Sequence, residues 1–429
     1  MRVLCAGDLH IGRRPTRLPM DVDSSRLSCA RAWESIVEYA VDQRVELLAL
    51  SGDVVDQSNR YYEAIGPLER GLARLREAGV TTVAVAGNHD HDVLPQVARS
   101  LNDDSFRLIG VGGVWERVTI TSASGERVHV DGWSFPSEHV QYDPLRSYEP
   151  QPDGDAPVLG LLHADLDAPG SSYAPVALTD LQARSVALWL LGHVHIPRLV
   201  DSGYGAPVLY PGSPQAMDPG EPGVHGAWLA ELRPLARPAP TLIPLSGVRY
   251  DADTVDVDGA AAIDDLRGRL ERHVTSTMSR MARESADHLR VLSLRVAITG
   301  ATALHREVRR EAAIVQRDFD WRDGDVRGFV ETVSVDTRPA RDLEALARGD
   351  DAVAVLAQLA LELASDDPLA HSAPIMGDVR EVANALIGAR QYRHVEDVRD
   401  GFDDAALRTI ARQQSLALLD ELLSQKDPA

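Results

Sequence analysis

Acidic and imidazole side chains spaced two residues apart recur where apolar runs of this sequence end. The run Leu188–Leu191 in LWLLGHVHIP leads into His193 and His195, and AGDLHIG places Asp8 and His10 at the same spacing. Alternate residues of an extended chain point to the same side, so each pair faces one point in space. A single pair of this kind is more often incidental than metal-binding, so other candidate ligands must converge on the same place.

Three further apolar runs end in residues that can bind a metal. LSGDVVD carries Asp53, VAGNHDHD carries Asn88 and His89, and GLLHAD carries His163. Each of these residues also has a structural explanation. Asp53 could cap a helix, Asn88 could hold a left-handed turn, and His163 could be a core histidine whose hydrogen bonds are all made. Their recurrence at run ends favours a shared site over independent coincidences.

The elements that must position these residues are short strands alternating with helices. In the first part of the chain the apolar patterns predict strands at 2–6, 45–53 and 80–90. They predict amphipathic helices at 31–43 and 64–79. This rhythm predicts an α/β layer whose strands are buried on both faces. Sites in such sheets gather beyond the carboxyl ends of the strands.

Domain organisation follows from length and from a change of pattern. A chain of 429 residues is too long for one ordinary core. From about residue 107 short strands predict a second sheet packed on the first, giving α-β-β-α layers over residues 1–245. Proline-rich 232–245 precedes a small α/β cap at 246–340, and 341–429 reads as a C-terminal helical region, a candidate partner-docking segment.

Composition bounds the function classes. The net charge of −21 argues against a general nucleic-acid coat protein, although a local basic or metal-lined groove stays possible. Cys5 and Cys29 make no disulfide framework, which favours a reducing, cytoplasmic setting. No apolar run reaches bilayer length, and the first residues do not resemble a signal peptide, so we expect no membrane segment.

The candidate ligands are imidazoles, carboxylates and one amide, without cysteine. This set suits two divalent metal ions, with Mn²⁺ preferred and Fe²⁺, Zn²⁺ or Mg²⁺ as alternatives. Seven ligands exceed the needs of one ion, so two ions sharing a carboxylate are the economical solution: Asp8, His10, Asp53, Asn88, His163, His193 and His195. Two adjacent ions can clamp a phosphate and activate water, which is chemistry for phosphate-ester hydrolysis.

The order D-x-H, GD, GNHD, a lone His and GHxH resembles that of the calcineurin-like metallophosphoesterases. RVLCAGDLHIG, LLALSGDVVDQ and VAVAGNHD resemble the SbcD-type DNA repair nucleases. LYPGSPQAMDPGEPGVHGAWLAEL and DGWSFPSEHV resemble the YhaO-type putative exonucleases of that group. The likeness is strong up to about residue 245 and rests on domain order beyond it.

This resemblance implies a metallophosphoesterase sandwich and a role for each ligand. The first metal would be held by Asp8, His10 and His195, the second by Asn88, His163 and His193, with Asp53 bridging the two.

Three further residues receive catalytic roles from the resemblance. His89 would lie beside the scissile phosphate and stabilise charge or protonate the leaving oxygen. Asp90 would orient His89, and Asp56 stands where some relatives have a second histidine. A water activated by the metals would attack phosphorus without a covalent enzyme intermediate.

The resemblance also implies partners. DNA would be the substrate, an SbcC-like coiled-coil ATPase would dock on the C-terminal helices, and a homodimer would form through helices near 60–100. The cap region contains a cluster of arginines, which could be a DNA-facing patch or, equally well, a helix face exposed to solvent: Arg295, Arg306, Arg309, Arg310, Arg317 and Arg322. Exonuclease and endonuclease action both stay open. The rivals are a phosphoesterase for small-molecule phosphodiesters or nucleotides and a catalytically silent scaffold.

Overall fold

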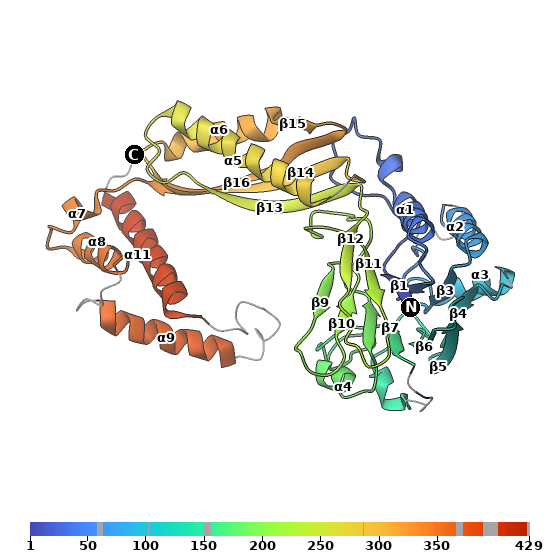
Figure 1. Cartoon of the computed structure of the whole chain (residues 1–429). Helices are drawn as coiled ribbons and strands as arrows, with labels where there is room; N and C mark the ends of the chain where they lie inside the picture. The colour runs from blue at the N-terminus through green and yellow to red at the C-terminus, as the bar shows by residue number, and fades with distance from the viewer. Residues whose placement is uncertain are drawn as a thin grey trace. The chain divides into compact units, whose positions relative to one another are not determined.

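The computed structural model describes residues 1–57, 63–101, 103–149, 154, 156–285, 287–365, 372–388 and 402–426. The chain divides into two compact units, and Figure 1 labels most of the helices and strands. The first comprises Met1–Asp253, Glu271–Val296 and Ile314–Val333, and the second comprises Thr254–Leu270, Ala297–Ala313 and Ser334–Ala429. Among the described helices, none combines the length and apolar character that a bilayer span requires.

The first sheet of the first unit has six strands in the order β12-β11-β1-β2-β3-β4. Strands β1 to β4 run parallel, whereas β11 and β12 are antiparallel additions at one edge. The bounds are Arg2–Ala6 for β1, Leu47–Leu50 for β2, Thr81–Ala84 for β3, Phe106–Leu108 for β4, Gly226–Glu231 for β11 and Thr241–Pro244 for β12.

The second sheet also has six strands, in the order β5-β6-β7-β8-β10-β9. Its central strands β6, β7, β8 and β10 are parallel, so their carboxyl ends share one edge. The bounds are Glu116–Thr121 for β5, Arg127–Trp133 for β6, Val158–His163 for β7, Leu188–Gly192 for β8, Arg198–Val200 for β9 and Val208–Tyr210 for β10.

A buried apolar layer joins the two sheets. Val3 and Leu47 of the first sheet belong to one core cluster with Val130 and Leu190 of the second. The opposite face of the first sheet is covered by α1 (Cys29–Asp42), α2 (Ile65–Glu77) and α3 (Leu94–Leu101), and that of the second by loops and α4 (Leu178–Gln182). The α-β-β-α layers predicted from the sequence are therefore confirmed.

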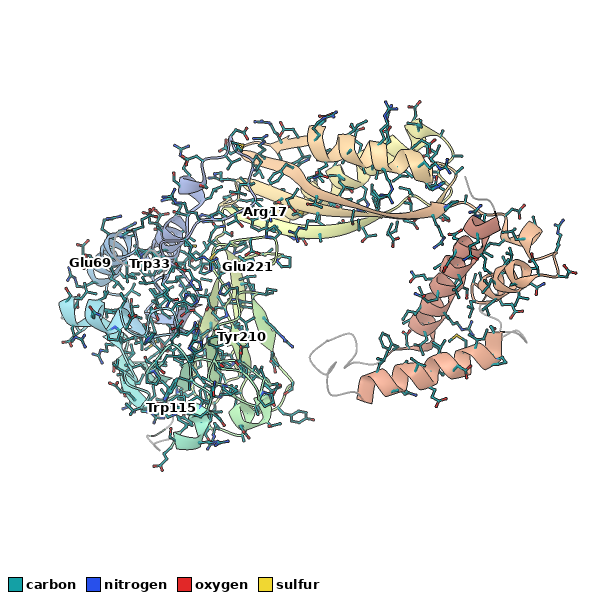
Figure 2. The ribbon with its side chains drawn as sticks, turned by 180° about the vertical axis from the view of Figure 1, so that it is seen from behind. Arg17, Trp33, Glu69, Trp115, Tyr210 and Glu221 are labelled. Carbon is teal, nitrogen blue, oxygen red and sulfur yellow. The ribbon has the colours of Figure 1, made fainter. Side chains whose placement is uncertain are left out.

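Helix α1 shows why these sequences form the outer layer. Its apolar residues recur three and four apart, so Trp33, Ile36, Val37 and Ala40 lie on one buried face. The indole of Trp33, labelled in Figure 2, donates a hydrogen bond of 3.0 Å to the carbonyl of Pro67 in α2. This contact joins the two helices, and both pack on the sheet below.

A smaller sheet follows, with strands in the order β13-β14-β16-β15. They span Val248–Asp256, Val291–Thr302, Val326–Pro339 and Asp320–Asp323 respectively, and the helices between them are α5 (Ile263–Glu284) and α6 (His305–Asp318). Three of the arginines considered as a DNA-facing patch are bonded to carboxylates: Arg295 to Glu331, Arg317 to Asp318 and Arg322 to Asp320. Their positive charge is locally compensated.

The C-terminal helices of the second unit are α7 (Leu343–Leu346), α8 (Ala352–Glu362), α9 (Ser372–Gly388) and α11 (Asp404–Lys426). Their apolar stripes pack on one another: Leu359 and Leu407 share one cluster, and Val353 and Leu419 share another. Leu418, in contrast, is 53% exposed. Mutual packing thus accounts for most of the stripe that the sequence analysis also considered as a docking face.

Candidate metal centre

The strand ends of both sheets are unusual in their backbone conformation. Four non-glycine residues there have positive φ: 49° at Asp8, 44° at His10, 51° at Asp53 and 98° at His193. Positive φ costs a residue with a Cβ atom free energy, and it is less rare for Asp and His than for most other residues. At Gly192 even a methyl group is excluded, because a Cβ would lie 2.1 Å from the carbonyl oxygen of Ser51.

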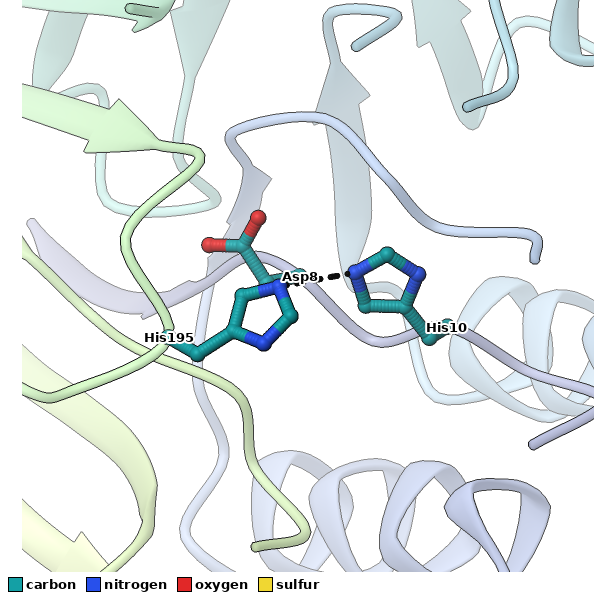
Figure 3. A group of neighbouring side chains, drawn as sticks. All are labelled: Asp8, His10 and His195. Atoms are coloured by element: carbon teal, nitrogen blue, oxygen red, sulfur yellow. Dashed lines mark hydrogen bonds between the residues drawn. The ribbon is translucent and has the colours of Figure 1, made fainter. Parts of the chain in front are cut away.

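Asp8, His10 and His195 come together although 185 residues separate the two histidines (Figure 3). Their candidate ligand atoms all lie within 4.8 Å of one another, and Asp8 and His10 are fully buried. The Nε2 atoms of His10 and His195 are 3.1 Å apart. The carboxylate of Asp8 accepts a 2.9 Å hydrogen bond from the main-chain N–H of His193, which ties β1 to the end of β8.

Carboxylates stand behind both imidazoles of this group. Nδ1 of His195 lies 2.7 Å from Oε1 of Glu221, and Nδ1 of His10 lies 3.5 Å from Oδ2 of Asp56. Because a carboxylate only accepts hydrogen bonds, Nδ1 of a neutral His195 carries the hydrogen and its Nε2 presents a lone pair, whereas Nδ1 of His10 makes no hydrogen bond among the described residues. The two Nε2 atoms attract each other at 3.1 Å when one of them carries a hydrogen, as in the Nε2–H tautomer of His10, or when a metal cation lies between them.

The pKa of His195 is set by opposing effects of burial and neighbouring carboxylates. Burial on its own lowers that pKa, but the hydrogen bond to Glu221 and the charge of Asp8 outweigh burial and hold it above its ordinary value. Burial also raises the pKa of Glu221, yet the bond from His195 reverses the effect and keeps that pKa low.

Asp53 lies at the centre of the candidate ligands. Its Oδ2 is 3.7 Å from Nε2 of His10, 3.6 Å from Nε2 of His163 and 4.0 Å from Nε2 of His89. Burial disfavours its ionised form, but the surrounding imidazoles outweigh burial and hold its pKa below the ordinary value. A buried carboxylate ringed by imidazoles is suited to bridging two cations.

Asn88 and His163 form a second pair of facing acceptors. Nδ1 of His163 lies 3.0 Å from the carbonyl oxygen of Ser51, to which it donates, so Nε2 presents a lone pair. That atom is 2.9 Å from Oδ1 of Asn88 in the amide orientation of the structure. Oxygen and nitrogen lone pairs converging on one point are what a cation requires, so the residues present fit a divalent metal.

His193 lies beside this pair with its own carboxylate. Its Nε2 is 3.3 Å from Oδ1 of Asp165, and its ring centroid is 5.3 Å from that of His163. The ring of His193 also lies against Tyr173, at 4.5 Å between centroids and 32° between the ring planes. Burial, and then the neighbouring His163, lowers the pKa of His193 to about 4, so the ring is neutral and suited to ligation. Because Nε2 faces Asp165, Nδ1 is the atom left for a metal.

His89, Asp90 and Asp56 differ in their relation to this cluster. The side chain of His89 is 33% exposed, and its buried Nδ1 has no hydrogen-bond partner among the described residues. The carboxylate of Asp90 accepts from the main-chain N–H groups of Gly87 and Val54, at 2.8 and 2.7 Å. These contacts hold two strand-end loops together, so the bonds of Asp90 go to main chain and not to the ring of His89.

Sequence reasoning missed Glu221 and Asp165. Asp165 follows His163 at the two-residue spacing that marked the other pairs, so its signal was present in GLLHAD. Glu221 lies in a long loop between β10 and β11, where no apolar run marks a strand end. Asp56 was found by position alone, and its contacts place it behind His10.

Comparison with known families agrees with this geometry. Residues 1–197 match the calcineurin-like phosphoesterase family. The motifs that supply the candidate ligands all lie within this matched range. Residues 250–338 match the middle domain of the metallophosphoesterase YhaO.

The curated relatives reported next are distant from this chain in sequence. The uncharacterized metallophosphoesterase YhaO of Bacillus subtilis is 28% identical over 53% of this chain and 56% of its own length. The DNA double-strand break repair protein Mre11 of Methanopyrus kandleri is 23% identical over 89% of this chain and 86% of its own. Among solved structures, a dimetal phosphatase from Danio rerio aligns with 56% of this chain and 98% of its own, at 15% identity and a TM-score of 0.35.

Proposed function

We propose that the chain is a two-metal phosphodiesterase that cleaves DNA during repair or end processing. The observation that carries the proposal is the convergence of candidate ligands at the strand ends, where Nε2 of His10 and of His195 face each other at 3.1 Å. The similarity to DNA double-strand break repair proteins over most of the chain supports DNA as the substrate.

The proposed sites divide the ligands into two groups around one bridge. Asp8, His10 and His195 would hold the first ion, Asn88, His163 and His193 the second, and Asp53 both. When bound, the two ions would acidify a water molecule and neutralise charge on the phosphate, with Mn²⁺ as the preferred ion.

The chain's own residues supply orientation and a proton. Glu221 holds the ring of His195 with Nε2 turned toward His10, and the carboxylate of Asp56 lies 3.5 Å from Nδ1 of His10. His89 is partly exposed, and its main-chain N–H donates a 2.9 Å hydrogen bond to Asp53, which fixes it at the rim. A proton on its ring would pass to the leaving oxygen.

The rest of the proposal concerns organisation. We assign the nuclease domain to 1–245, the cap to 246–340 and the helical region to 341–429. An SbcC-like ATPase would dock on exposed apolar side chains such as Leu418, and a homodimer would form through helices near 60–100. The setting would be cytoplasmic.

A phosphodiesterase for small molecules is the second candidate. A net charge of −21 repels the DNA backbone, and three arginines near the cap are bonded to carboxylates. Both features favour a small substrate that makes few contacts outside the metal centre.

One assay separates the candidates. The full chain is incubated with single-stranded DNA, duplex DNA with defined ends, or bis-p-nitrophenyl phosphate, in Mn²⁺, Mg²⁺ or chelator. We expect Mn²⁺-dependent DNA cleavage that His89→Ala strongly reduces. Turnover of the small ester without DNA cleavage would favour the second candidate, and no turnover of either, with no metal bound, would favour the scaffold.

A further inference from the structure

Glu221 is a buried acid outside every motif that marks the metal centre. It lies in the loop between β10 and β11 and is 7% exposed (Figure 2). One of its oxygens faces Nδ1 of His195 at 2.7 Å. The other accepts 2.9 Å and 2.8 Å hydrogen bonds from the hydroxyl of Ser213 and the main-chain N–H of Met217.

We propose that Glu221 is a positioning residue that sets the tautomer of His195 and thereby the strength of the first metal position. This inference rests on the proposed function. The main-chain N–H of Met217 can only donate and the hydroxyl of Ser213 donates to the same oxygen, so Oε2 of Glu221 is an acceptor. An ionised Glu221 then leaves Nδ1 of His195 as the donor to Oε1. With Nδ1–H of His195 committed to Glu221, the lone pair of Nε2 must point toward His10 and Asp8.

The loop that carries Glu221 is anchored to the loop that carries His10. The carbonyl of Met217 accepts a 2.8 Å hydrogen bond from the main-chain N–H of Thr16, six residues beyond His10. The hydroxyl of Thr16 adds a second bond to the same carbonyl, at 3.2 Å. Glu221 is thus held from both sides, and it cannot rotate away from His195 without breaking main-chain contacts.

The chemistry of the amide makes Glu221→Gln a sharp probe. The main-chain N–H of Met217 can only donate and its position is set by the backbone, so the single oxygen of the new glutamine side chain is expected to accept from it. The amide NH₂ then faces His195 and donates to Nδ1, which forces the hydrogen onto Nε2 and removes the lone pair that would bind metal. Glu221→Ala leaves both tautomers accessible, so it costs less metal affinity although it removes more packing.

The test is Mn²⁺ binding by the full chain, followed by calorimetry and by the electron paramagnetic resonance of free Mn²⁺, with thermal unfolding measured beside it. We expect Glu221→Gln to lower the affinity for one of the two Mn²⁺ ions by about 10- to 100-fold and to leave the affinity for the other unchanged. Glu231→Gln is the matched control, because Glu231 carries the same charge on β11 and is about half exposed.

The order of the variants separates positioning from packing. Stronger loss of metal in Glu221→Gln than in Glu221→Ala, together with higher thermal stability of Glu221→Gln, supports the proposal. The proposal is overturned if the less stable variant is also the one that loses more metal affinity. It is equally overturned if Glu221→Gln binds metal with wild-type affinity. If Glu221→Ala fails to fold, the comparison of Glu221→Gln with Glu231→Gln still decides. Wild-type protein that binds no metal would overturn the proposed function as well.

Discussion

The imidazole nitrogens of His10 and His195 face each other at 3.1 Å, each backed by a carboxylate on the far side of its ring. A hydrogen on one of the two nitrogens, or a cation between them, holds the rings together. Burial lowers the pKa of His195, but the hydrogen bond to Glu221 and the charge of Asp8 outweigh burial and raise that pKa above its ordinary value, which favours an additional proton on this ring. Proton and metal therefore compete for one place.

This competition predicts how metal affinity depends on pH. Metal binding needs His195 without its extra proton, so affinity is full above the raised pKa and falls as pH drops below it. We expect the affinity for the first Mn²⁺ ion to fall by about tenfold per pH unit in that range, because binding displaces one proton. Calorimetry at pH 8, 7 and 6 measures this, and equal affinity at all three would contradict it.

Asp53→Asn tests the proposed bridge. The substitution keeps the shape of the side chain but removes the charge that the surrounding imidazoles favour, so we expect loss of at least one ion and of hydrolysis to assay background. Circular dichroism should show the fold retained. Asp104→Asn, at an exposed position, serves as control, and unchanged turnover in Asp53→Asn would disprove the bridge.

Asp165→Asn tests the second position independently of the first. Asp165 faces Nε2 of His193, so its replacement should weaken the second ion by about tenfold and spare the first. Competition titrations that resolve the two ions check this. Weakening of the same ion by Asp165→Asn and Glu221→Gln would contradict the division of ligands.

Gly192→Ala probes the strand end that carries His193 and His195. The added methyl group would overlap the carbonyl oxygen of Ser51, so β8 and β2 must move apart. We expect a loss of about 1–3 kcal/mol in the free energy of unfolding, together with weaker metal binding. Gly170→Ala is the control, because nothing lies within 4 Å of the added atom there. Urea unfolding of both variants gives the comparison, and equal stability would rule out the predicted clash.

The layers of the fold could be predicted because apolar periodicity reports burial directly. The strand expected at 45–53 ends at Leu50, since Asp53 adopts a left-handed conformation that no pattern of side chains reveals. The candidate ligands were found because each lies in a short motif at a strand end. Glu221 could not be found this way, because its role depends on a loop that folds back across the sheet edge.

The loops that carry Thr16 and Glu221 are also hydrogen-bonded to the strand β13. The hydroxyl of Tyr250 donates to the carbonyl of Thr16, and the main-chain carbonyl of Tyr250 accepts from Gly223, two residues after Glu221. Tyr250 lies in β13, where the match to the YhaO middle domain begins. A displacement of this strand would therefore act, through these two hydrogen bonds, on the loops that carry Thr16 and Glu221.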